Sequence, residues 1–123
     1  MDKAHQINDK FLKRKEKISA QIQRKTLKPI DSLHIFNNNI FLTTNNVIII
    51  HTKTNGDVYT CESVVENNQV KMIPNTTIFY KDTTFQDTCQ EEFQELDIIY
   101  QTYKKELKKE IKKQYKKNTH YIE

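Results

Sequence analysis

The stretch VIIIHTKTNGDVYTCESVV, residues 47–65, decides the fold class of this chain. Two β-branched runs, 47–53 and 58–65, flank the pair Asn55-Gly56. Asn-Gly is the favoured centre of a type I′ hairpin turn, because both central positions of that turn need a positive φ. The stretch therefore predicts two antiparallel strands joined by a two-residue loop.

The expected hairpin register fixes which side chains share a face. With the Asn-Gly pair as the loop, Ile50 faces Cys61 and His51 faces Thr60. Because side chains alternate along a strand, Cys61 and His51 then point to opposite faces and cannot form a Cys–His nucleophile pair. We expect the Ile50 face to carry the core. On the other face, His51 and Glu62 occupy diagonal positions and are expected to form at most a polar pair.

Outside this hairpin, residues 32–81 continue with short β-branched and aromatic runs between Asn clusters. Asn favours turns because it tolerates positive φ. The other expected strands are 33–36, 40–44, 70–73 and 77–81, separated by Asn37-Asn38-Asn39, Asn45-Asn46, Asn67-Asn68 and Pro74-Asn75. Connections this short join antiparallel neighbours. We expect an antiparallel meander or small barrel of five or six strands.

On the N-terminal side, residues 3–25 predict a basic amphipathic helix. The segment holds no Gly or Pro. Its apolar residues fall in a narrow arc of ~60° at 100° per residue, and they are Ala4, Ile7, Phe11, Ile18 and Ile22. Pro29 marks the end of the segment, since the residue before a proline is pushed out of the helical region.

On the C-terminal side, residues 89–118 predict a long helix that runs from acidic to basic. Thr88 and Glu91 have the spacing of a capping box at its start. Its core-facing stripe is Phe93, Leu96, Tyr100, Tyr103, Leu107, Ile111 and Tyr115. Such a helix is about 45 Å long, which exceeds the ~17 to 24 Å of the strands. Its basic half must therefore project past the sheet, or pack on the N-terminal helix or on a second subunit.

These elements together predict an α+β fold: an N-terminal amphipathic helix, an antiparallel sheet and a long C-terminal helix. The 123 residues are expected to form a single domain, 1–123. Charge is segregated along it. Residues 1–30 hold nine Lys or Arg against three acids, 31–99 hold three against ten, and 100–123 hold eight Lys against three acids.

The basic ends carry the candidate contacts to nucleic acid. Eight lysines of the last helix form four Lys-Lys pairs at spacing four, a ridge that is able to follow a phosphate backbone. The candidate nucleic-acid-binding residues are Lys104, Lys105, Lys108, Lys109, Lys112, Lys113, Lys116, Lys117, Lys13, Arg14 and Arg24. The alternative is a solvated face of a long helix. Only two of the twenty cations are Arg, which disfavours base-specific readout.

Two sets of aromatic residues are candidates for stacking on bases, although each is also explained by packing. Tyr100, Tyr103 and Tyr115 lie on the apolar stripe, which favours a helix-pairing seam. Phe41, Phe79 and Tyr59 belong to expected strands and are available for stacking only where one face of the sheet is open.

The sequence disfavours an enzyme. A single glycine excludes the common phosphate-binding loops, and neither a metal-ligand set nor a nucleophile pair is evident, so we expect no cofactor. Cys61 and Cys89 are isolated, which is typical of free thiols in a reducing compartment. No apolar run approaches the ~18 residues of a membrane span. We expect a cytoplasmic protein.

Two functions remain open from the sequence. The first is a small regulatory or accessory protein, such as one of a mobile element, that contacts RNA or the DNA backbone through the Lys-rich helical surfaces. The second is a protein-interaction or assembly module whose amphipathic helices pair between subunits, for example in a homodimer.

Overall fold

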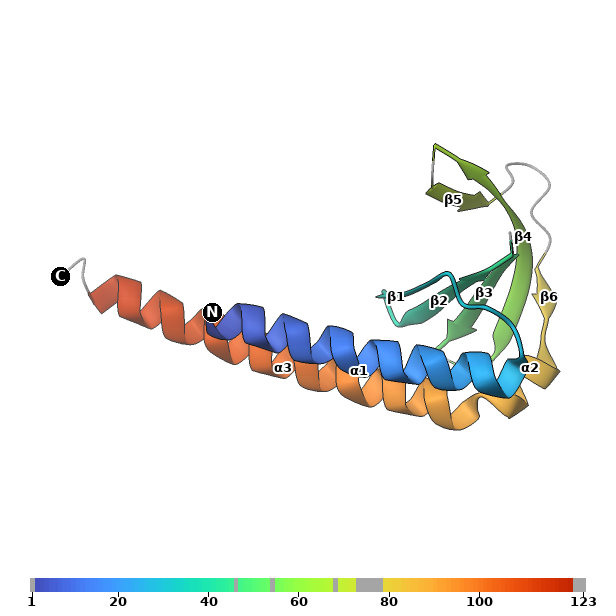
Figure 1. The fold of residues 1–123 in the computed structure, drawn as a ribbon. Coiled ribbons are helices and arrows are strands. Elements are labelled where there is room, and N and C mark those ends of the chain that lie inside the picture. The colour runs from blue at the N-terminus through green and yellow to red at the C-terminus, as the bar shows by residue number, and fades with distance from the viewer. Residues whose placement is uncertain (1, 46, 54, 68, 73–78, 121–123) are drawn as a thin grey trace.

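A computed structural model describes residues 2–45, 47–53, 55–67, 69–72 and 79–120, with the backbone alone at 63–66, 69–72 and 117–120. Its elements are α1 (Lys3–Thr26), β1 (Ser32–Phe36), β2 (Asn39–Thr44), β3 (Val47–Thr52), β4 (Val58–Glu66), β5 (Gln69–Met72), β6 (Tyr80–Lys81), α2 (Thr83–Thr88) and α3 (Gln90–His120). Two long helices lie side by side and run in opposite directions, with the sheet on one side of the pair (Figure 1). The predicted α+β fold is confirmed.

The strands form an antiparallel sheet in the order β1-β2-β3-β4-β5, which is not closed into a barrel. The open-sheet alternative of the prediction is therefore the one observed. The short strand β6 pairs with Tyr59 and Thr60 of β4. Those two residues pair with β3 on their other side, so β6 occupies the edge of β4 that β3 leaves open. Part of the strand expected at 77–81, and position 73 of the one expected at 70–73, lie outside the described residues.

Asparagine builds the tight turns of this sheet. Asn37 and Asn38 both have positive φ, 48° and 64°, and they join Phe36 to its partner Asn39 in a two-residue loop. Positive φ at both central positions is the signature of a type I′ turn. Asn45 and Asn67, at φ 46° and 50°, begin two further two-residue loops. At the second central position of the first turn, Asn38 thus stands where type I′ turns most often have Gly.

The predicted register of the β3–β4 hairpin is wrong by two residues. His51 pairs with Val58 and Ile48 pairs with Cys61. The loop has four residues, since Thr52 N–H donates to the Asp57 carbonyl at 2.9 Å and Gly56 N–H donates to the Thr52 carbonyl at 2.7 Å. A shift of two residues keeps every side chain on its face, so Cys61 and His51 still point to opposite sides.

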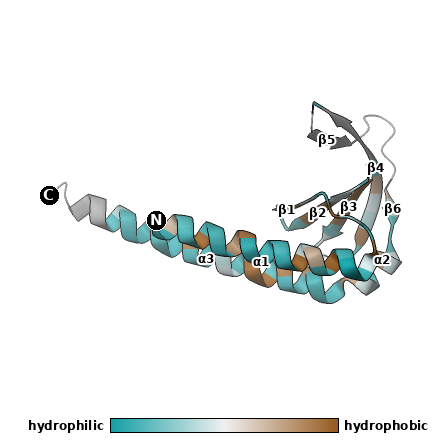
Figure 2. Cartoon of the chain, viewed as in Figure 1, coloured by the Kyte–Doolittle hydropathy of each residue, from teal (hydrophilic) through white to brown (hydrophobic). Residues whose placement is uncertain are grey.

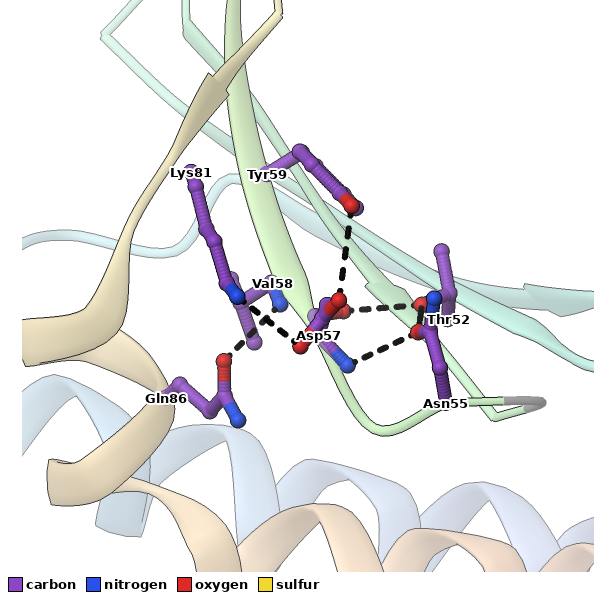
Figure 3. A network of polar contacts seen from close by, with 7 residues as sticks. All are labelled: Thr52, Asn55, Asp57, Val58, Tyr59, Lys81 and Gln86. Carbon is purple, nitrogen blue, oxygen red and sulfur yellow. Dashed lines mark hydrogen bonds and ion pairs between the residues drawn. The ribbon is translucent and has the colours of Figure 1, made fainter.

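Side-chain hydrogen bonds explain the longer loop (Figure 3). Asn55 Oδ1 accepts from the backbone N–H of Asp57 at 3.0 Å and also from the Thr52 hydroxyl. The same hydroxyl lies 3.0 Å from the Asp57 carbonyl oxygen. An Asn side chain used in this way closes the loop from inside, and the two-residue turn is not formed.

The helices cover the face of the sheet that was not expected to carry the main core. Leu42, Ile49 and Val58 are buried there, together with Phe93 and Leu96 of α3. Ile50 and Cys61 belong instead to a second, smaller cluster on the opposite face. The prediction of the core face was wrong because β3 is apolar on both sides and both of its faces are buried.

The two long helices close on each other along one seam. Phe11 of α1 stacks on Tyr103 of α3 with the ring centroids 4.5 Å apart, and the Tyr103 hydroxyl donates to Asn8 Oδ1 at 2.6 Å. Near the other end, Lys25 Nζ lies 2.8 Å from Glu92 Oε1, and the Glu92 side chain is only 1% exposed. Hydrophobic and hydrophilic residues alternate along both helices where they lie side by side, and the described part of α3 beyond the start of α1 is mostly hydrophilic (Figure 2).

The capping box expected at Thr88 and Glu91 is not formed. The Thr88 hydroxyl donates to the Thr84 carbonyl at 2.7 Å, as it does inside a helix, because the short helix α2 occupies this segment. Asp82 is the N-cap of α2, since its carboxylate accepts from Phe85 N–H at 2.9 Å. The long helix α3 follows after Cys89.

Candidate nucleic-acid interface

The C-terminal part of α3 extends beyond α1. Lys10 of α1 lies 3.8 Å from Glu106 of α3, and the helices are antiparallel, so Lys3 at the start of α1 is opposite about residue 113. The remaining residues of α3 continue past the N-terminus of α1 (Figure 1). Two of the three options for the basic half are therefore realised in turn: it first packs on α1 and then projects.

Exposed lysines line the basic half of α3, both alongside α1 and beyond it. We define the lysine ridge as Lys104, Lys105, Lys108, Lys109, Lys112, Lys113 and Lys116, all of which are exposed. At 100° per residue the ridge lies on the side of α3 turned away from α1. Lys104 Nζ lies 4.9 Å from the centre of the Tyr100 ring. In the part of the chain with described side chains, no carboxylate pairs with a lysine of the ridge. The side chain of Lys117, also predicted to bind, lies outside that part.

The predicted cations of α1 do not join the ridge in one site. Lys13 is exposed and pairs with Asp9 at 3.1 Å. Arg14 lines a shallow hollow between α1 and α3 beside Glu106. Arg24 is exposed near the opposite end of the helix pair, about 35 Å along the axis from Lys116. The eleven predicted residues therefore divide into the ridge and a dispersed set on α1.

Two of the three helical tyrosines lie in the seam between α1 and α3, as the packing explanation predicts. Tyr100 and Tyr103 both contact Phe11 in the seam. Tyr115 is 72% exposed, as is Ile111 at 58%, and both belong to the expected apolar stripe.

Among the sheet aromatics, Phe41 packs in the smaller cluster and Tyr59 is half-buried. Phe79 is 50% exposed but precedes β6 instead of lying in it. Phe36 and Tyr80 are more exposed than Phe79, and sequence reasoning missed them. The alternation of side chains along a strand does not tell which face of that strand is open to solvent.

A cleft of about 330 Å³ opens between the β3–β4 loop and the start of α3. Most of its lining residues carry polar side chains, and the lining consists of His51, Lys53, Asn55, Gly56, Gln86, Gln90, Phe93, Gln94 and Asp97. Lys53 Nζ and Asp97 Oδ1 form an ion pair of 2.9 Å in its wall. Sequence reasoning did not find this cleft, because its residues come from two stretches of the chain, 51–56 and 86–97, that meet only in the folded structure.

His51 forms part of the cleft wall and stacks on Phe93, with the ring centroids 4.3 Å apart. Burial lowers the pKa of His51 below 6.5, and the negative charge of Asp97 opposes this shift. Its Nδ1 atom is buried and has no hydrogen-bond partner among the described residues. Glu62 pairs with Val47, four residues along β3 from His51, so the polar pair expected between His51 and Glu62 is not formed.

Neither cysteine is arranged for catalysis. Cys61 and Cys89 are buried as free thiols. Burial raises the pKa of Cys61, and it raises that of Cys89 to about 11, so both thiols are protonated at neutral pH. Within the described ranges, no three His, Cys, Asp or Glu side chains converge as metal ligands do.

Comparisons with protein-family models, with curated proteins and with solved structures give no match for this chain. In the part of the chain that the structure describes, no helix is both long enough and apolar enough to span a bilayer.

Proposed function

We propose that this protein is a small non-enzymatic accessory protein that binds nucleic acid, RNA or the DNA backbone, through the lysine ridge of α3. The observation that carries the proposal is that all of these lysines are exposed and that, among the described side chains, none of them pairs with a carboxylate. Three lysines of α1, by contrast, each have a carboxylate partner: Lys10 pairs with Glu106, Lys13 with Asp9 and Lys25 with Glu92.

The dimensions of the ridge suit a polyanion. From Lys104 to Lys116 it extends about 18 Å along the helix, and each lysine that neutralises a phosphate releases a counterion. The acids near the start of α3, Glu91 and Glu95, are exposed and disfavour phosphate at that end. Because the ridge contains only Lys, it supplies positive charge without the bidentate fork that reads guanine.

A filter-binding assay with a mixture of short RNA and DNA strands tests the proposal. The variant Lys112→Glu/Lys113→Glu is compared with Lys13→Glu/Arg24→Glu, which changes the net charge equally but lies on α1. We expect the first to lose at least tenfold in affinity and the second much less. Equal losses, or no retention of nucleic acid by the wild type at low salt, would exclude the ridge as the interface.

The second candidate function is assembly, and the exposed residues Ile111 and Tyr115 favour it. They continue the apolar stripe of the seam toward the part of α3 that lies beyond α1. A helix of a second subunit is able to cover them. Light scattering distinguishes the functions: a defined dimer that is lost in Ile111→Glu, without nucleic-acid binding, would favour assembly.

A further inference from the structure

The cleft and the lysine ridge lie on one face of α3. At 100° per residue, the cleft residues Gln90, Gln94 and Asp97 fall within an arc of about 80° that also contains Lys104 and Lys108. Asp97 and Lys104 are separated by about 10 Å along the axis. A strand whose phosphates follow the ridge is therefore directed toward the mouth of the cleft.

Hydrogen bonds to the backbone fix the orientation of two side-chain amides in the cleft. Gln86 Oε1 accepts from the backbone N–H of Val58 at 3.3 Å, and Asn55 Oδ1 accepts from that of Asp57 at 3.0 Å (Figure 3). With both oxygens occupied, the amide NH₂ groups remain for a ligand. The ammonium of Lys53 adds a third donor.

Asp97 supplies the cleft with an acceptor for N–H groups of a ligand. Its carboxylate is 37% exposed and uses Oδ1 for Lys53 and for Gln101, which leaves acceptor capacity on Oδ2. The cleft thus offers several donors and one carboxylate acceptor beside an aromatic wall formed by His51 on Phe93. Its volume is at the lower end of the range of ligand pockets, which suits one base and excludes a duplex.

We propose that this cleft binds one unpaired guanine base of a single strand whose backbone lies on the lysine ridge. Guanine offers two acceptors, O6 and N7, to Lys53 and the two amides, and its N2–H₂ group is a donor for Asp97. Adenine has the donor group N6–H₂ where guanine has the acceptor O6, so in the same position its N6–H₂ group would face the donors of the cleft. Sequence-specific contacts to single strands are made in this way, by bases splayed out of the stack.

The inference rests on the proposed function, and one experiment separates the two. Binding of the full chain to a seven-nucleotide oligouridine is compared with binding to the same strand carrying a single central guanine or adenine. We expect the guanine strand to bind about tenfold more tightly than the other two, with the same dependence on salt, because the added contacts release no counterion.

Asp97→Asn tests the carboxylate, with Glu95→Gln as the matched control on the same helix. Asp97→Asn should abolish the preference for guanine and leave oligouridine binding unchanged, whereas Glu95→Gln should retain the preference. As a second readout, the His51 ring resonances of the wild type should shift on titration with guanosine and not with adenosine.

Salt-dependent binding of all three strands with equal affinity would overturn the guanine site and leave the proposed function standing. Absence of binding to every strand at low salt would overturn both. A preference for guanine that survives in Asp97→Asn would also overturn the proposal, since its acceptor would then lie elsewhere.

Discussion

The two halves of α3 have the same helical period but differ in the burial of their apolar residues and in the pairing of their charges. Between Gln90 and Leu107 the apolar stripe is covered by α1 and the sheet, and Phe93 and Leu96 are buried. Beyond Leu107 the same stripe continues with Ile111 and Tyr115, which are exposed. The stripe therefore sets which side of the helix is apolar, whereas the length of α1 sets how much of that side is buried.

Charges follow the same division. In the first half, Glu92, Asp97 and Glu106 each have a lysine partner. Beyond Leu107 the described charges are Glu110 and lysines, and no lysine of the ridge pairs with a carboxylate among the described side chains. Among the described side chains, the ion pairs of α3 are therefore confined to its first half.

The largest contrast between the halves is expected from truncating one apolar residue in each. Leu96→Ala removes a fully buried side chain and should lower the free energy of unfolding by about 2–5 kcal/mol. Ile111→Ala should change it by less than about 0.5 kcal/mol, as exposed substitutions do. Urea denaturation measures both values. Equal losses would mean that Ile111 is buried against a partner in solution.

The next contrast concerns the ion pair of the packed half. Lys25→Met leaves the Glu92 carboxylate buried without its partner and should strongly destabilise the fold, because an unpaired buried charge is costly. The double variant Lys25→Met/Glu92→Leu should recover most of the loss. Thermal unfolding followed by circular dichroism provides the measurement, and Lys116→Met, in the projecting half, is the control.

That ion pair also predicts a response to alkaline pH. The hydrogen bond to Glu92 raises the pKa of Lys25 above 10.5. The folded chain therefore holds this proton more tightly than the unfolded chain, and the stabilisation is complete below pH 10.5 and is lost as the pH rises beyond it. Stability without any decline in that range would contradict the role of the pair.

A smaller effect is expected at acidic pH from the cleft. Because burial lowers the pKa of His51, the unfolded chain binds this proton more readily, so its contribution is complete above pH 6.5 and is lost as the pH falls below that value. His51→Phe retains a ring against Phe93 and should flatten the decline. Urea midpoints at about pH 7 and about pH 5 test this, and an equal decline in the variant would assign the loss to other groups.

The smallest change in stability should come from removing the projecting half. A chain that ends at Glu110 lacks Ile111 and the last ridge lysines, none of which contributes to the core. We expect its unfolding free energy to be within about 0.5 kcal/mol of that of the whole chain, while nucleic-acid binding falls at least tenfold. A marked loss of stability would place the end of α3 in a packed interface.

Local signals in the sequence predict most of the fold. The helix expected at 3–25 is observed as Lys3–Thr26, since its limits depend on a nearby proline and on an uninterrupted helical period. The strands on either side of Asn37-Asn38, Asn45 and Asn67 are found for a similar reason, because these asparagines adopt the positive φ on which the predicted turns depend.

The wrong predictions of local structure have one physical origin. Contacts that the local sequence pattern does not reveal compete with the structure that the pattern predicts. Asn55-Gly56 predicts a two-residue turn, but the Thr52 hydroxyl and the Asn55 side chain close a longer loop. The capping box at Thr88 gives way to α2, which Asp82 caps. The lysines of the ridge are evident in the sequence, whereas the cleft is not, because residues 51–56 and 86–97 meet there only in the folded chain.

The salt dependence of nucleic-acid binding tests the role of the lysine ridge most directly. The logarithm of the binding constant of a short single strand is measured against the logarithm of the salt concentration, for the wild type and for Lys108→Ala/Lys109→Ala/Lys112→Ala/Lys113→Ala. Removing one lysine–phosphate interaction should make the slope shallower by about 0.7, so the slope of the variant should be shallower by up to about 3 units. An unchanged slope, with unchanged affinity, would contradict binding through the lysine ridge.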